Sequence, residues 1–184
     1  MAFYAKIVQL YFYDYAIMSA NVDFDDAVLH DCPELAKFLF ATGSLTSLLE
    51  KQAGRRLVVQ VLSEGFVPLT HHQKIALNLP INKAQLAWQR SVLLYGCDKE
   101  AWVCASSIFP LNVLKGKLKR LKHLGKTPIG RVLFAKRQPM IEHRTFYHHK
   151  NPARDTCYQT EAGRLLISEQ FLPAFINHLK HTAQ

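Results

Sequence analysis

The sequence has few cysteines, and they are not arranged as a disulfide framework or a zinc site would require. The 184 residues include four cysteines, at positions 32, 97, 104 and 157. They form no CxxC pair, so we expect reduced thiols in an intracellular protein. The nine histidines include the pairs His71-His72 and His148-His149, but no HExxH motif or comparable helical pair. The sequence therefore predicts no metal site.

The sequence also lacks a hydrophobic run long enough to cross a bilayer. The N-terminal stretch MAFYAKIVQLYFYDYAIMSAN is apolar and aromatic, but Lys6, Gln9 and Asp14 interrupt it, and a spanning helix needs roughly 20 apolar residues. We expect a cytoplasmic protein without stable membrane insertion. Met18 precedes a helix-like segment and is an alternative start of translation. On this interpretation residues 1–20 are an extension and residues 21–184 are the domain.

Acidic residues are scarce relative to basic ones. Fourteen Asp and Glu against 23 Lys and Arg give a net charge of +9, which raises the local concentration of any anion. Glycine-rich phosphate loops and the GxSxG motif are absent, so nucleotide-dependent and serine-hydrolase chemistry have no support. No helix-turn-helix, zinc-finger or RNP signature is present, and we expect no nucleic-acid partner. A small anionic ligand and an anionic membrane surface stay open.

Turn signals and hydrophobic periodicity predict a single α+β domain. With 49% hydrophobic residues, the chain can bury one sizeable core. Segments rich in β-branched and aromatic residues predict strands at 56–66, 86–96, 101–110 and 164–172. Capping residues and apolar periodicity predict helices at 33–40, 44–54, 111–125 and 127–134. The polar turn CDKE joins 86–96 and 101–110 as a hairpin, whereas 135–160 carries no assignable pattern. We expect one antiparallel β-sheet flanked by helices.

Two predicted strands each place one charge on an apolar face. Side chains alternate along a strand, so Glu169 shares a face with apolar residues of 164–172, and Arg90 does the same in 86–96. An unpaired buried ion costs several kcal/mol. The two residues therefore pair with each other, or lie at a wet strand end, or face an enclosed ligand pocket. In a pocket, Arg90 would bind a ligand carboxylate and Glu169 would meet a hydroxyl.

Two predicted helix starts suit the same anionic ligand. Unpaired backbone N–H groups at the start of a helix form an anion site, although most helix starts bind only their own cap. The first start is Ser44-Leu45-Thr46. The second is Thr127-Pro128-Ile129, where proline has no N–H and Ile129 supplies the first donor.

The segment LNVLKGKLKRLKHLG is strongly basic. Leucines at 111, 114, 118, 121 and 124 form an apolar stripe, and lysines occupy the other faces. The ordinary interpretation is a solvated basic face over a leucine core. The alternative is peripheral contact with anionic lipid through 111–124.

Four motifs, in order, resemble the chorismate pyruvate-lyase family, whose members make 4-hydroxybenzoate for ubiquinone. They are EGFV at 64–67, WQRSVLL at 88–94, LGKTPIGR at 124–131 and SEQFLP at 168–173. The resemblance extends from about Leu35 to Pro173. It implies a cytoplasmic lyase that needs no cofactor, with an antiparallel sheet, flanking helices and an enclosed site for the substrate chorismate. We expect it to act as a monomer.

The resemblance assigns four residues to the site. It implies that Arg90 binds the substrate carboxylate, that Glu169 contacts a hydroxyl, and that Leu45 and Ile129 contribute backbone N–H groups. The family has methionine at the Leu45 position and leucine at the Ile129 position, but the backbone donors are retained.

One departure from the family concerns a second arginine. An arginine common in the second hairpin strand aligns with Ser106, and Arg154 or Arg131 would have to replace its contact. The same fold also resembles the effector-binding domains of some bacterial transcription regulators. A non-catalytic binding module for a small aromatic carboxylic acid is therefore the alternative function.

Overall fold

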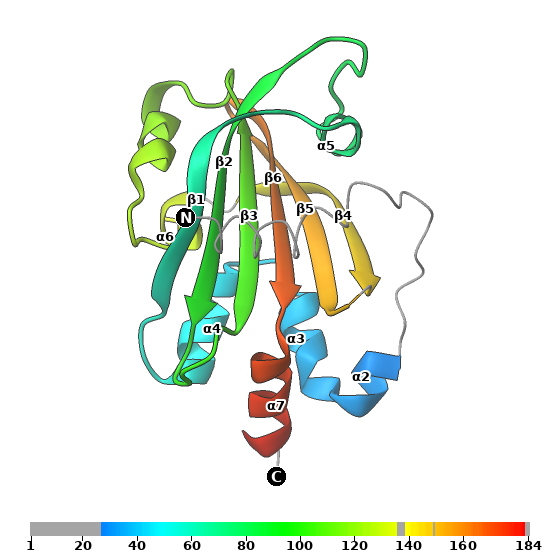
Figure 1. Ribbon diagram of the computed structural model, residues 1–184, viewed down its shortest axis with the longest axis vertical. Helices are drawn as coiled ribbons and strands as arrows, with labels where there is room; N and C mark the ends of the chain where they lie inside the picture. Colours follow the sequence, from blue (N-terminus) through cyan, green and yellow to red (C-terminus); the bar gives the residue numbers. More distant parts are fainter. Residues whose placement is uncertain (1–26, 136–138, 149, 183–184) are drawn as a thin grey trace.

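The computed structural model describes residues 27–135, 139–148 and 150–182. Over these ranges the chain forms one six-stranded antiparallel sheet in the order β1-β2-β3-β6-β5-β4 (Figure 1). The strands are β1 (Val58–Pro68), β2 (Leu86–Tyr95), β3 (Val103–Pro110), β4 (Met140–His148), β5 (Pro152–Thr160) and β6 (Gly163–Phe171). The proposed extension at 1–20, with Met18, lies outside the described residues.

Helices flank this sheet, which confirms the α+β prediction. They are α2 (Ala27–Asp31), η2 (Pro33–Leu35), α3 (Ala36–Leu39), α4 (Leu45–Ala53), α5 (His71–Ala76), η3 (Gly116–His123), α6 (Ile129–Leu133) and α7 (Pro173–Thr182). Figure 1 shows α7 following directly from the end of β6. Within the described ranges, every helix is too short or too polar to cross a membrane.

The local signals at 33–54 are confirmed by the helices that form there. The Ser44 hydroxyl accepts a hydrogen bond from the N–H of Ser47 at 3.3 Å and caps α4. Gly54 ends that helix with a φ of 64°, a conformation that glycine adopts at little cost. The helix predicted at 33–40 begins as a 3₁₀ turn and continues as α3.

The basic segment 111–124 is helical, but its regular part is a 3₁₀ helix, η3, preceded by turns. Residues three apart eclipse one another in a 3₁₀ helix. Leu118, Leu121 and Leu124 therefore share one face, and the last two are buried. Leu114 is also buried and Leu118 is partly buried, but Leu111 is 45% exposed. The predicted leucine stripe is therefore confirmed except at its first residue, and it did not distinguish the two helix types.

Strands β4 and β5 lie in the segment that the sequence pattern left unassigned. Most of β5, with the sequence PARDTCYQT, is buried. Its buried side chains include Arg154, Asp155 and Thr156. Strand signals depend on apolar residues alternating with polar ones, so a buried strand with polar side chains gives no such signal.

A β-bulge in β1 decides which side chains face the helices. The register with β2 shifts between Val61 and Ser63, and one extra residue reverses the alternation of faces. Val61 pairs with Val92 before the bulge. Beyond the bulge, Glu64 rather than Ser63 pairs with Arg90, on the same face of the sheet as Val61.

A second bulge acts in the same way at the far edge of the sheet. The register between β4 and β5 shifts between Ile141 and His143. Arg144 is consequently paired with Thr156, on the face that also carries Arg154 and Glu169, two residues paired with each other across β5 and β6.

Two apolar clusters cover the helix-facing side of the sheet. One lies under α3, α4 and α7 and includes Phe38, Leu45, Leu49, Val92, Leu94, Ala105, Phe171 and Phe175. The other lies under η3 and α6 and includes Phe109, Leu121, Leu124, Leu133, Tyr158, Leu165 and Ile167. A third cluster, on the opposite face, includes Leu69, Leu77, Ile108 and Leu166.

Candidate active site

A row of charged side chains crosses the helix-facing side of the sheet between its two apolar clusters. On β6, Ile167 belongs to one cluster and Phe171 to the other, and Glu169 lies between them. The row extends across the sheet, and we call it the charged row. Its members are Glu64, Arg90, Glu169, Arg154 and Arg144. Three arginines and two glutamates give the charged row one excess positive charge, which suits an anionic ligand.

Arg90 is held by two contacts that leave part of its guanidinium unused. Its Nε donates to Glu64 Oε1 at 2.7 Å, and its Nη2 donates to the carbonyl oxygen of Gly125 at 2.6 Å. The side chain is only 1% exposed. Its Nη1 makes no hydrogen bond to any residue that the structure describes. A guanidinium carries five N–H donors, so donors are left for a ligand carboxylate.

Arg154 and Glu169 form a second buried pair. Arg154 Nε donates to Glu169 Oε2 at 2.6 Å. Arg154 Nη1 donates to the carbonyl oxygens of Phe38 and Leu39, both at 2.8 Å, and of Ala41 at 3.0 Å. The arginine therefore ties Glu169 to the end of α3. Among the described residues, Arg154 Nη2 is buried without a partner and Glu169 Oε1 accepts no hydrogen bond.

Arg144 and Tyr158 complete the polar part of the site. Arg144 donates from Nε to Thr156 Oγ1 and from Nη1 to the carbonyl oxygen of Ala41, both at 2.8 Å. Burial, and then the positive charge of Arg154, lower the pKa of Arg144. Burial, and then the negative charge of Glu169, raise the pKa of Tyr158, so its phenol is neutral at physiological pH.

Arg90 and Glu169 do not pair with each other, which removes one alternative left open by the sequence. Strand β3 separates them, with Ser107 paired to Arg90 and Ala105 paired to Glu169. Two strand spacings amount to about 10 Å across the sheet. Each charge has its own counter-ion, Glu64 for Arg90 and Arg154 for Glu169.

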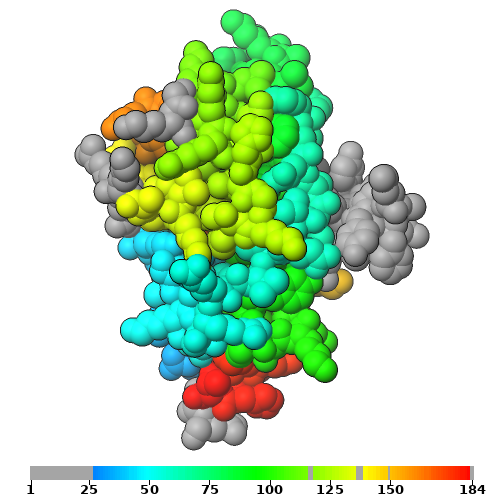
Figure 2. Space-filling model, turned by 90° about the vertical axis from the view of Figure 1, so that its left-hand side faces the viewer, coloured from blue at the N-terminus to red at the C-terminus, as the bar shows by residue number. Residues whose placement is uncertain are grey.

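The two predicted helix starts lie against each other. A Cβ atom built on Gly130 would lie 2.4 Å from Thr46 Oγ1 and 2.9 Å from Ser44 Oγ. Glycine is therefore required where α6 meets the start of α4. In Figure 2 the yellow segment with α6 lies directly above the cyan segment with α4. Within the described part of the chain, the N–H groups of Leu45 and Ile129 donate no hydrogen bond.

The start of α6 differs slightly from the prediction. Pro128 is the residue before the first helical residue, and Thr127 does not cap the helix. Ile129 is thus the first helical residue, and the backbone donors expected there are unchanged. Arg90 reaches the same region through its bond to Gly125.

Ser106 does not face the charged row. It pairs with Ser91, and its hydroxyl accepts a hydrogen bond from Gln89 Nε2 at 3.1 Å on the opposite face of the sheet. Of the two arginines named as replacements, Arg131 is exposed and pairs with Glu50 between α6 and α4. Arg154 lies in the charged row.

The sequence pattern correctly predicted that Arg90 and Glu169 face inward, but it did not predict which residues hold them. Glu64 belongs to the EGFV motif at 64–67. The bulge in β1 reverses the alternation of side chains there, so the sequence pattern did not show which face of the sheet Glu64 occupies. Arg144 and Tyr158 lie in the unassigned segment. The sequence signal that could have placed Arg144 and Tyr158 near the site is the polar segment that precedes the motif SEQFLP.

The fold and the charged row place the protein among α+β proteins with a buried, net positive site on an antiparallel sheet. The family model described as chorismate lyase matches residues 22–180. A probable chorismate pyruvate-lyase of Psychrobacter cryohalolentis is 44% identical over 146 residues, 77% of this chain and 87% of the relative. The chorismate pyruvate-lyase of Escherichia coli O9:H4 is 33% identical over 147 residues, 77% and 84% of the two chains. The chain belongs to the chorismate lyase family.

Comparison with solved structures gives more distant similarities. The effector domain of PhnF from Mycobacterium smegmatis has a TM-score of 0.48 and 10% identity, over 73% of this chain and 91% of that chain. A GntR-family transcriptional regulator from Bacillus cereus has a TM-score of 0.46 and 9% identity, over 64% and 92%. The enzymes named above are much closer in sequence, which favours a lyase over the non-catalytic binding module.

Proposed function

We propose that the protein removes pyruvate from chorismate at the charged row and leaves 4-hydroxybenzoate. The bond between ring C3 and the ether oxygen breaks, C4 loses its hydrogen, and the enolpyruvyl methylene gains one. Aromatisation of the ring drives the reaction, so no redox cofactor or metal is needed for it. The observation that carries the proposal is the charged row with unused arginine donors in a member of this family.

Arg90 anchors the ring carboxylate in this proposal. Its unused donors meet the carboxylate oxygens, and Glu64 and Gly125 fix the plane of the guanidinium. The N–H groups of Leu45 and Ile129 supply two further donors from the adjoining starts of α4 and α6. Donors on three different elements define the position of the ring.

Glu169 binds the 4-hydroxyl group and orients the ring. Its Oε2 is occupied by Arg154, and its Oε1 is left to accept from a hydroxyl. Because Arg154 holds the carboxylate through an ion pair, we infer that Glu169 positions the substrate while the hydrogen moves within it. A proton transfer through Glu169 is the alternative.

The second carboxylate of chorismate, on the enolpyruvyl group, needs another cation. Arg154 and Arg144 both have a buried Nη2 without a partner among the described residues. A carboxylate placed between them would satisfy both donors. Arg154 therefore replaces the contact that the family's second-strand arginine would make. Ser106 needs no role because it faces away.

Further parts of the proposal follow from family membership. The ligand site is enclosed by α4 and α6, and the domain spans 21–184 and acts as a monomer without a cofactor. We place the reaction in the cytoplasm, as the first step of ubiquinone biosynthesis. The exposed Lys115 and Lys119 in the segment 111–124 allow peripheral contact with the membrane to which quinone precursors are delivered.

The test is to incubate purified protein with chorismate and to measure 4-hydroxybenzoate and pyruvate. We expect equal amounts of both. Arg90→Ala removes two charge-assisted hydrogen bonds and should lower kcat/KM by about 10²–10⁴-fold. Arg164→Ala is the control, because that arginine is half-buried and pairs with Glu142 outside the charged row. Folded protein that binds chorismate without forming either product would instead support the binding module.

A further inference from the structure

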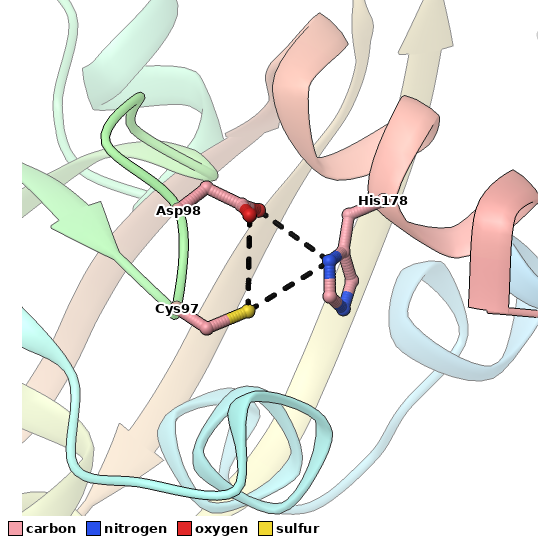
Figure 3. A group of neighbouring side chains, drawn as sticks. All are labelled: Cys97, Asp98 and His178. Carbon is pink, nitrogen blue, oxygen red and sulfur yellow. Dashed lines mark hydrogen bonds and ion pairs between the residues drawn. The ribbon is translucent and has the colours of Figure 1, made fainter.

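Three potential metal ligands lie together at one end of the sheet, away from the charged row. Cys97 and Asp98 are in the turn between β2 and β3, and His178 is on α7 (Figure 3). The thiol of Cys97 and both carboxylate oxygens of Asp98 point toward the imidazole, whose Nδ1 faces them. The cysteine and the aspartate are exposed and the histidine is partly buried, so an ion can enter from solvent.

The three ligand groups lie close to the spacing of a tetrahedral zinc site. Cys97 Sγ lies 3.8 Å from His178 Nδ1 and 3.9 Å from Asp98 Oδ1, and His178 Nδ1 lies 3.4 Å from Asp98 Oδ2. Zinc–ligand distances of about 2.3 Å to sulfur and about 2.0–2.2 Å to nitrogen or oxygen give tetrahedral edges of about 3.6 Å and about 3.4 Å. The two aspartate distances end on different oxygens, and the three ligand atoms lie within 4.8 Å of one another, so the Asp98 carboxylate must turn to bring one oxygen to both partners.

One buried indole organises this cluster. Trp102 is 0% exposed, and its Nε1 donates to Asp98 Oδ2 at 2.5 Å. The ring of His178 contacts the indole, with centroids 4.5 Å apart. A Cβ atom built on Gly96 would lie 2.4 Å from the same ring, so the turn before Cys97 is pressed against it. A neighbouring group that orients ligands in this way strengthens metal binding by about 10–100-fold.

The orientation of His178 leaves only one nitrogen available. Its Nε2 is buried and has no partner among the described residues, whereas Nδ1 faces Cys97 and Asp98. A metal on Nδ1 fixes the tautomer with hydrogen on Nε2. The imidazole is therefore placed as a ligand rather than as a proton shuttle between two partners.

We propose that Cys97, Asp98 and His178 bind one Zn²⁺ ion, with water as the fourth ligand. Thiolate and carboxylate together balance the charge of the ion, and a set of one sulfur, one nitrogen and one oxygen suits zinc better than Mg²⁺ or Ca²⁺. The ion joins the β2–β3 turn to the C-terminal helix. The sequence predicted no metal site because its patterns require ligands that are close in the chain, whereas His178 follows Asp98 by 80 positions.

The experiment is a zinc titration of tag-free, chelator-stripped protein against a chromophoric competitor at neutral pH. We expect one ion per chain, no response to Mg²⁺, and a higher Tm in the presence of zinc. Cys97→Ser and His178→Gln should each weaken binding at least about 100-fold and abolish the shift in Tm. His181→Gln, an exposed histidine on the same helix, should bind as the wild type does.

Cobalt provides a readout that depends on the thiolate. Co²⁺ in the wild type should give a tetrahedral visible spectrum with a sulfur-to-cobalt charge-transfer band, and Cys97→Ser should lose that band. Circular dichroism of each variant verifies that it is folded. Because Cys97 is exposed, Cys97→Ser should disturb the fold less than His178→Gln. Zinc affinity that is unchanged in Cys97→Ser, or lost equally in His181→Gln, would overturn the proposal.

Discussion

Replacing Gly130 by alanine should separate the two helix starts that we place around the substrate carboxylate. The added Cβ would lie 2.4 Å from Thr46 Oγ1, 2.9 Å from Ser44 Oγ and 3.0 Å from Thr46 Cβ. The hydroxyl of Ser44 caps α4, so it cannot turn away without losing that bond. The start of α6 must therefore move away from α4, and the distance between the N–H groups of Leu45 and Ile129 grows.

The size of the effect follows from the overlap. Ordinary carbon contacts lie at about 3.5–4.0 Å, so relief of the shortest contact requires a displacement of about 1 Å. Overpacking of this kind lowers the free energy of unfolding by about 1–3 kcal/mol. A misplacement of about 1 Å in a substrate-positioning group lowers kcat/KM by about 10²-fold. Gly130→Ala should thus lose activity well before it loses its fold.

The assay compares Gly130→Ala with Gly43→Ala by urea unfolding and by chorismate turnover. Gly43 lies just before α4, and a Cβ there meets nothing within 4 Å, so its replacement should change stability by less than about 0.5 kcal/mol. Thr46→Ala removes the shortest contact and should restore part of the activity in the double variant. If Gly130→Ala were as active as Gly43→Ala, the two helix starts would not position the substrate.

Three further predictions concern single side chains. Glu169→Gln should keep kcat within about tenfold of the wild type, because the amide oxygen can keep the bond from Arg154 while the amide NH2 donates to the oxygen of the hydroxyl; a loss of 10²-fold or more in steady-state kinetics would show that the carboxylate transfers a proton. Glu64→Gln takes the counter-charge from the buried Arg90 and should lower the free energy of unfolding by about 1–3 kcal/mol in urea; an unchanged midpoint would show that the pair adds no stability. Burial raises the pKa of Cys104 to about 12, so at pH 8 an alkylating agent should label the exposed Cys97 first, and mass spectrometry showing equal labelling of Cys104 would contradict the buried position of β3.

The sequence predicted those parts of the fold that depend on neighbours along the chain. Ser44 and Gly54 mark the ends of α4 because a cap and a left-handed glycine act within one turn. The hairpin of β2 and β3 follows from two apolar segments around a polar turn. Arg90 and Glu169 were identified because a single charge interrupts a period of two on each strand.

The polar strand β5 shows where such reasoning ends. Its side chains are buried because neighbouring strands and the end of α3 satisfy them. The α3 carbonyl groups that Arg154 contacts are more than 100 positions away in the chain, and periodicity carries no information about them. For the same reason the sequence could not specify whether Arg90 and Glu169 pair with each other.

Patterns in the sequence were enough to predict an α+β domain, a resemblance to the chorismate pyruvate-lyase family and two inward charges. The tertiary structure decided the counter-ions of those charges, because one bulge in β1 turns Glu64 toward Arg90 and the order of the strands brings Arg154 to Glu169. It also brought Cys97 and Asp98 to His178. Contacts between distant segments depend on register and packing, which local propensity does not encode.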